Sequence, residues 1–193
     1  MRKILLISGM AFLALQCNKK EETTTAAAVE EVPVQTEINV DSLKAYADET
    51  KKTLVKTLTQ EIEEGGAEAA VTFCKTEAGP LVKSVADKHG LEIKRVTDKP
   101  RNQNNLANEP ELRIIEKYKQ ELLEGKTLQA TTTDSHYYEP LVTNALCMQC
   151  HGEKGKNIAP GTAGKIAELY PEDKAFGYRE NEVRGLIRIA RSK

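Results

Sequence analysis

Five consecutive residues carry most of the chemistry of this chain: Cys147-Met148-Gln149-Cys150-His151. Two cysteines three residues apart, followed at once by a histidine, form the attachment signal for a c-type haem. Each thiol adds to one haem vinyl group, and the adjacent imidazole then lies close enough to ligate the iron. The pattern therefore predicts one covalently bound haem c, with His151 as the proximal iron ligand.

Three other kinds of site are also built from a cysteine pair. A zinc site normally takes four ligands from two separated pairs, whereas Cys147 and Cys150 form a single pair. A thioredoxin-like redox pair is expected on a strand-to-helix step, without a fixed histidine after it. A structural disulfide needs only an oxidising compartment. The contiguous His151 favours haem over all three.

The second axial ligand of the iron has several candidates. The usual methionine is missing, because Met1 and Met10 would leave with the leader and Met148 lies inside the attachment motif. Soft or imidazole side chains remain at three positions: Cys74, His89 and His136. A cysteine on the apolar stripe of a helix, as Cys74 is, more often packs as a small hydrophobe. From the residues alone, the choice stays open between these side chains and an open coordination site.

The N-terminus has the pattern of a secretory leader. Arg2 and Lys3 supply positive charge, and residues 4–15 form an apolar stretch too short for a transmembrane span. The stretch ends in Leu13-Ala14-Leu15-Gln16-Cys17, which resembles a bacterial lipobox. We therefore expect residues 1–16 to be a signal peptide of the lipoprotein type and Cys17 to be lipidated. This predicts a membrane-anchored protein of the periplasm or cell envelope, the compartment in which haem c is attached.

Composition limits the organisation and the partners. The 193 residues carry 28 Lys+Arg against 29 Asp+Glu, so the chain lacks the basic excess of nucleic-acid-binding proteins. Residues 17–40 are polar and rich in Thr, Ala and Glu, which predicts a flexible tether. Residues 41–193 are enough for one domain with its own core.

Apolar spacing predicts helices in the first part of this domain. The first helix would begin at an Asp41-Ser42 cap and stop at Gly65-Gly66. The second would run from about Ala67 to His89-Gly90, bent at Gly79-Pro80. Two more helices are expected, one from Pro110 to Gly125 and a short one over 164–170.

Strand patterns are scattered through the second part. They cover residues 91–96, 127–133, 137–142 and 183–190, with a loop over 99–108. Helices first and strands later predict an α+β fold with an antiparallel sheet.

Four stretches resemble a known family, the single-haem c-type domains with a PAS-like fold called the Tll0287-like haem domain. The resemblance runs from about Asp41 to the C-terminus. The stretches are Phe73-Cys74-Lys75 with Ala78-Gly79-Pro80; Lys94-Arg95-Val96 with Lys99-Pro100-Arg101-Asn102 and Asn105; Glu139-Pro140-Leu141-Val142 with the Cys147–Gly152 segment; and Val183-Arg184-Gly185-Leu186-Ile187.

The resemblance implies a fold and a ligand set. It implies a PAS-like antiparallel sheet with long N-terminal helices around one haem. It also implies that Cys74 is the distal iron ligand. Arg95, Arg101, Asn102 and Asn105 would form a loop near the haem, where arginine suits the propionate carboxylates.

The ligand set indicates what such a protein would do. A thiolate ligand favours ferric iron, and its bond should weaken on reduction, which would leave room for CO or NO. We therefore expect a sensor of redox state or of a small diatomic gas, which signals to a separate partner protein. The alternative is an electron-transfer cytochrome with a membrane or soluble redox partner. An enzyme is not expected, because His136 is the one candidate for a distal acid–base group.

Overall fold

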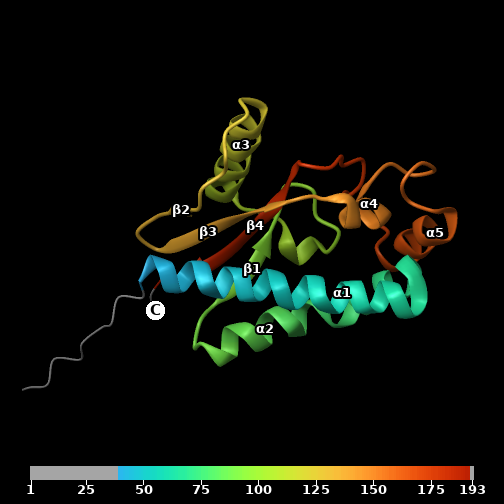
Figure 1. Ribbon diagram of the computed structural model, residues 1–193, viewed down its shortest axis with the longest axis horizontal. Helices are drawn as coiled ribbons and strands as arrows, with labels where there is room; N and C mark the ends of the chain where they lie inside the picture. The colour runs from blue at the N-terminus through green and yellow to red at the C-terminus, as the bar shows by residue number, and fades with distance from the viewer. Residues whose placement is uncertain (1–38, 192–193) are drawn as a thin grey trace, which may run out of the picture. The chain divides into compact units, whose positions relative to one another are not determined.

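The computed structural model describes residues 39–191, which form five α-helices and a four-stranded antiparallel sheet (Figure 1). The α+β class expected from the sequence is confirmed. The predicted leader, Cys17 and nearly all of the tether lie outside the described residues. The elements in chain order are α1 (Val40–Thr76), α2 (Ala78–Lys88), β1 (Ile93–Val96), the 3-10 turn η1 (Gln103–Asn105), α3 (Glu109–Leu123), β2 (Thr131–Thr132), β3 (His136–Val142), α4 (Ala145–His151), α5 (Pro160–Leu169) and β4 (Val183–Ala190).

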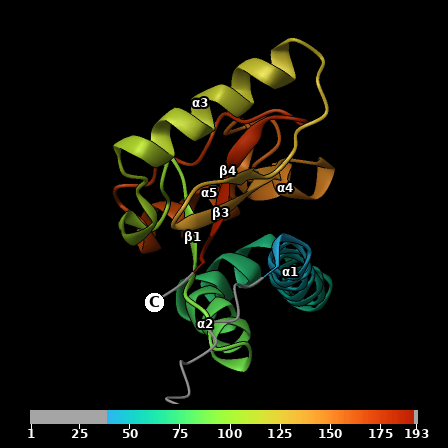
Figure 2. The same cartoon turned by 90° about the vertical axis from the view of Figure 1, so that its left-hand side faces the viewer.

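The sheet separates two layers of helices. Its strand order is β1-β4-β3-β2, so the last strand of the chain pairs with both β1 and β3. Ile187, Ile189 and Tyr137 face α1 and α2 on one side. Leu186 and Tyr138 face α3 on the other. Figure 2 shows the sheet edge-on, with α3 on one side and α1 with α2 on the opposite side.

The helix α1 is two helical segments joined at a sharp break. Gly66 has φ 72° and ψ −178°, backbone angles that are essentially restricted to glycine. The stop predicted at Gly65-Gly66 is therefore confirmed, although hydrogen bonding continues through it. Beyond the break, the second segment of α1 carries Cys74.

Two predicted helix boundaries are wrong. Asn39, not Asp41-Ser42, caps α1, since its side chain accepts from Asp41 N at 3.0 Å. The second long helix is interrupted at Glu77 rather than at Gly79-Pro80. Pro80 lies in the first turn of α2, where its missing N–H has no helical partner to lose.

Elements that depend on long-range contacts also differ from expectation. Only Thr131–Thr132 of the predicted strand 127–133 pairs, because β3 meets it over just two residues. The short helix α5 begins at Pro160, four residues before the predicted start.

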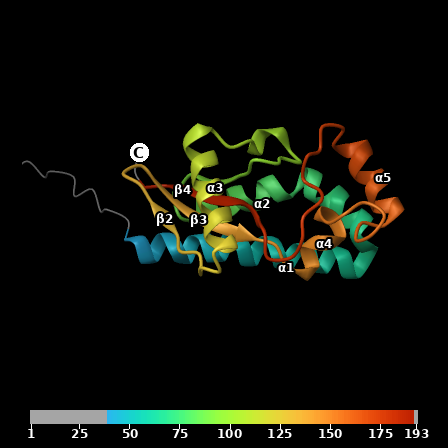
Figure 3. The ribbon, with the colours of Figure 1, turned by 90° about the horizontal axis from the view of Figure 1, so that it is seen from above.

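One end of the described unit is built from α4, α5 and the end of α1, which lie together in Figure 3. A small apolar cluster of Val71, Ile158, Ile166 and Tyr170 joins them, with Cys150 packed against it. No helix within residues 39–191 is long and apolar enough to cross a membrane.

Candidate haem site

The CxxCH motif forms the short helix α4. Asn144 caps this helix, and its side-chain oxygen accepts from Cys147 N at 3.4 Å. Gly152 follows at once, and a Cβ there would lie 2.8 Å from the Met148 carbonyl. A side chain at this position would therefore push the chain away from α4. One helical turn thus places both motif thiols and His151 together.

His151 is held in one tautomer. Its Nδ1 lies 2.7 Å from the Ala175 carbonyl, and a carbonyl oxygen can only accept, so Nδ1 carries the hydrogen. Burial keeps the pKa of His151 well below its usual value, and the charges of Arg184 and Arg101 act in the same direction. A neutral ring with hydrogen on Nδ1 has its lone pair on Nε2, which is the form that ligates a metal.

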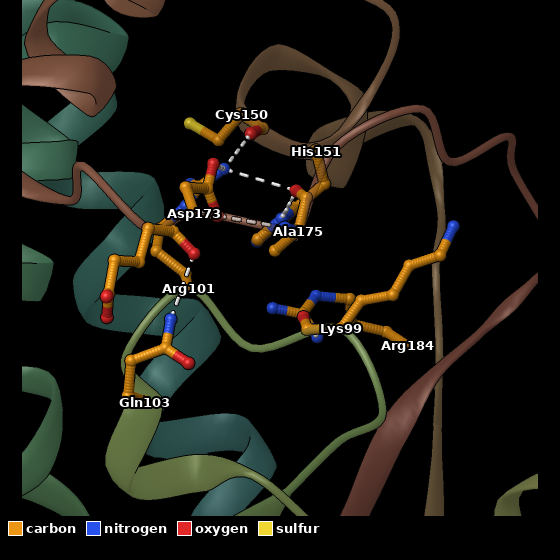
Figure 4. A network of polar contacts seen from close by, with 9 residues as sticks. Lys99, Arg101, Gln103, Cys150, His151, Asp173, Ala175 and Arg184 are labelled. Carbon is orange, nitrogen blue, oxygen red and sulfur yellow. Dashed lines mark hydrogen bonds and ion pairs between the residues drawn. The ribbon is translucent and has the colours of Figure 1, made fainter.

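Arg101 fixes the surroundings of this histidine (Figure 4). Its guanidinium donates to Asp173 at 3.1 and 3.2 Å, and the two side chains are only 11% and 5% exposed. The same Nη2 donates to the Cys150 carbonyl at 2.6 Å and to the Ala175 carbonyl at 3.2 Å. Arg101 therefore connects the attachment helix to the carbonyl that orients His151. Because Nε and Nη2 already donate to protein acceptors, the expected contact with a haem propionate stays a prediction.

Cys74 lies near the attachment thiols. Burial raises the pKa of Cys74, opposed by the charges of Arg95 and Arg101. Burial also raises the pKa of Cys150 to about 11, with Arg101 opposing and Cys74 adding to the rise. Cys150 packs against the cluster that contains Val71, one turn before Cys74 on the same helix. The second segment of α1 thus brings a third thiol to this end of the sheet.

Arg95 carries a positive charge that no acidic side chain among residues 39–191 pairs with. It is half-buried in β1, and burial lowers its pKa while Cys74 opposes that effect. No hydrogen bond or ion pair to its side chain is found among residues 39–191. Arg184 is also largely desolvated; its Nη1 donates to the Thr97 hydroxyl at 2.8 Å and to the Lys99 carbonyl at 3.2 Å, while its Nε has no partner in the described part of the chain. Two thiols, an imidazole with a free Nε2 and the unpaired guanidinium of Arg95 form a donor set that fits haem c with its propionates.

The two asparagines predicted near a haem brace their own loop. Asn102 caps η1 by accepting from Asn104 N at 3.0 Å. The Asn105 carbonyl accepts from Thr97 N at 2.9 Å. These contacts lie within the loop itself, so the haem-binding roles of both residues stay predictions.

The other two histidines lie elsewhere. His89 pairs with Glu49 at 2.7 Å and stacks on Tyr46, both in the first turns of α1. His136 begins β3, so the length of that strand, roughly 20 Å, separates it from α4. The structure therefore brings Cys74, but neither of these histidines, toward His151. Within residues 39–191 no three His, Cys, Asp or Glu side chains gather as a protein-ligated metal ion would require.

Four residues of this site were not predicted as site residues: Asp173, Ala175, Tyr178 and Arg184. Arg184 stands in one of the stretches that resemble the Tll0287-like family, and an arginine within an apolar strand was a usable signal. The others lie in an irregular loop with no periodicity to mark them.

Comparisons with known proteins agree with this geometry. The family model described as Tll0287-like matches residues 21–192. The chain belongs to the Tll0287-like family. The family inferred from four short stretches is thereby confirmed. The crystal structure of the cyanobacterial heme-protein Tll0287 superposes with a TM-score of 0.60 and 23% sequence identity, covering 80% of this chain and 97% of that chain. A comparison with curated proteins gives no match. At this identity, the superposition shows that the Tll0287-like chain shares the fold.

Proposed function

We propose that this chain is a lipid-tethered, extracytoplasmic haem c protein that senses redox state or a small diatomic gas. One haem would be attached through Cys147 and Cys150, with His151 and Cys74 as axial ligands. The observation that carries the proposal is the orientation of His151, whose Nδ1 donates to a backbone carbonyl beside two paired thiols. That arrangement leaves Nε2 available to iron.

The two axial side chains are held very differently, which favours sensing. When bound, the haem supplies one-electron redox chemistry and an iron with two axial positions. His151 is kept in place by Ala175, which Arg101 and Asp173 hold in turn. No hydrogen bond to the Cys74 thiol is found in the described part of the chain. If Cys74 were an iron ligand, no hydrogen bond from the described residues would hold it in place, and protonation of its Sγ would neutralise the side chain on release. A fixed ligand opposite a releasable one makes a two-state element that a signal can bias.

Electron transfer is the second candidate. The contacts that hold α4 favour this role. Arg101 pairs with Asp173 and donates to the Cys150 carbonyl, so α4 would move little when the redox state changes, as fast electron transfer requires. In that case a redox partner, rather than a signalling partner, would contact the protein.

Changing Cys74 tests the ligand set. The full chain is made in a host that attaches haem c, and its intact mass and optical spectra are measured with and without reductant. Cys74→Ala should keep the covalent haem, shift the ferric Soret band and raise the reduction potential, since a thiolate favours ferric iron. Thr72→Ala, an exposed change on the same helical segment, should leave both unchanged. Wild-type protein without haem mass would overturn haem attachment, whereas a Cys74→Ala spectrum like that of the wild type would overturn only the thiolate ligand.

Gas binding separates the two roles. Loss of the thiolate features on reduction, followed by rapid CO or NO binding, supports sensing. A reduced spectrum that keeps both ligands and resists CO supports electron transfer.

The membrane anchor has its own test. Expression in a lipoprotein-processing bacterium should yield a lipid-modified chain in the membrane fraction, and Cys17→Ser should release it. Wild-type chain without lipid mass would contradict the anchor.

A further inference from the structure

The strand β1 lies at one edge of the sheet. In the strand order β1-β4-β3-β2 it pairs only with β4. Successive residues of an antiparallel strand direct their N–H and C=O groups alternately toward the partner strand and away from it. Ala190 N donates to the Glu92 carbonyl at 3.0 Å, so Lys94, two residues further, also faces β4. The backbone groups of Ile93 and Arg95 therefore point outward from the sheet.

The free part of this edge is short. Thr97 also points outward, but its N–H donates to the Asn105 carbonyl and its carbonyl accepts from Ala107 N, both at 2.9 Å. No residue within 39–191 bonds to the outward groups of Ile93 and Arg95. A cavity of about 400 Å³ lies beside them instead, between β1 and α2. An uncovered edge of this kind is a template for another strand.

Lys94 is a cation on this edge that lacks an acid. Its cross-strand neighbour on β4 is Arg188, and like charges directly opposite each other are destabilising. Arg188 is itself paired with both Glu92 and Glu111, whereas no ion pair to Lys94 is found in the described part of the chain. Glu92 is 56% exposed, and only its Oε1 contacts Arg188. The edge thus presents a lysine without an acid and, two residues away on the same face, a carboxylate with a free oxygen.

A second copy of this chain matches both features. We propose that β1 pairs antiparallel with β1 of a second copy, around a twofold axis at Ile93. Glu92 then lies opposite the partner's Lys94, and Lys94 opposite the partner's Glu92. Ile93 exchanges its outward N–H and C=O with the partner's Ile93, and Arg95 N–H meets the partner's Leu91 carbonyl. The same patch serves both copies, as a twofold interface requires.

The other registers of this pairing are disfavoured. An axis at Lys94 places two lysines opposite each other. An axis at Arg95 needs the backbone groups of Thr97, which Asn105 and Ala107 already occupy. A lysine on an edge strand commonly prevents pairing. Here Glu92 makes the edge complementary to itself, and in one register only.

Charge reversal tests the pairing. The full haem-loaded chain is studied in mild detergent by sedimentation over a range of concentrations. Because the paired segment is short, the wild type should dimerise weakly, as the concentration approaches roughly 0.1 mM. Lys94→Glu should weaken dimerisation by about tenfold or more, since the new carboxylate faces the partner's Glu92. Glu92→Lys should do the same, and the double variant should restore the dimer.

Lys52→Glu is the matched control. It makes the same charge change at an exposed position of α1 that does not line the cavity, so dimerisation should be unchanged. Thermal melting checks that each variant is folded. Lys94→Glu should melt no lower than the wild type, because its carboxylate would face Arg188 within the same chain.

Amide exchange resolved by residue identifies the paired edge. The Ile93 amide should be protected in the wild type and the double variant but not in Lys94→Glu, whereas the Lys94 amide, which bonds to β4, should be protected in all that retain it. A wild type that stays monomeric overturns the proposal. So does a dimer with an unprotected Ile93 amide, which would use another surface, or a double variant that does not regain the dimer. Protection of Ile93 in a monomer also overturns it, because the edge would then have a different occupant.

Discussion

At the scale of single residues, Arg101 connects parts of the site that lie far apart in the sequence. Its guanidinium donates to the Cys150 carbonyl, the Asp173 carboxylate and the Ala175 carbonyl. These residues follow Arg101 in the sequence by 49, 72 and 74 positions. It therefore joins the attachment helix to the loop that sets the His151 tautomer. Because both members of the Arg101–Asp173 pair are nearly buried, removal of one leaves a desolvated charge without a partner.

Arg101→Gln should destabilise the protein by about 3 kcal/mol for that reason. Urea denaturation of the wild type and the variant measures the difference. Arg113→Gln is the matched control, since Arg113 is 71% exposed and lies 4.0 Å from Glu109, and it should have little effect. If the two variants were equally stable, the ion pair would not hold the site together.

The residues of this site were enough to propose a chemistry for it, whereas the side chains that support the site could not be predicted. Cys147, Cys150 and His151 lie within five residues of one another, so their spacing alone predicted haem attachment, which stays a prediction. Cys74 stood out as a thiol on a helix stripe, and a family resemblance was needed to choose it. The pairing of Arg101 with Asp173 depends on two irregular loops meeting in space, which no local pattern encodes.

At the scale of elements, the break in α1 decides where Cys74 lies. A continuous α1 would carry this residue straight past the end of the sheet, about 1.5 Å further per residue. Gly66 redirects the chain instead, and Lys75 then ties the second segment to α5 by donating to the Leu169 carbonyl at 3.1 Å. The glycine pair was readable from the sequence because a non-glycine residue is strained at this geometry. The two-residue length of the strand β2 could not be predicted from the sequence, since it depends on where β3 pairs with it.

Gly66→Ala should destabilise the fold by roughly 1–3 kcal/mol, the strain of a side chain in this backbone region. Gly164→Ala is the matched control, because Gly164 is exposed within the helix α5 and a Cβ there would meet open space. That change should be neutral or slightly stabilising, since alanine is the better helix former. Thermal melting distinguishes them, and a neutral Gly66→Ala would show that the break does not depend on glycine.

At the scale of the described unit, the three buried apolar clusters differ in size. Two clusters fill the two faces of the sheet, and both include residues of β3 and β4. The site rests on a third and smaller cluster, contributed by α1 and by the segment that contains α5. Because fewer buried apolar contacts hold this end, we expect the candidate haem site to open at a lower free-energy cost than the two larger clusters.

Amide hydrogens at the candidate haem site should therefore exchange faster than those in the central sheet. In haem-free protein, made as the Cys147→Ser, Cys150→Ser double variant, amides of α4 and α5 should exchange much faster than those of β3 and β4. Haem attachment should slow α4 and α5 selectively, because a group that binds only the closed form stabilises it. The paired amides of β3 and β4 act as the internal control and should change little. Uniform protection across all four elements in the haem-free variant would contradict the third cluster as a separate, weaker support, and would mean that the site opens only when the whole unit unfolds.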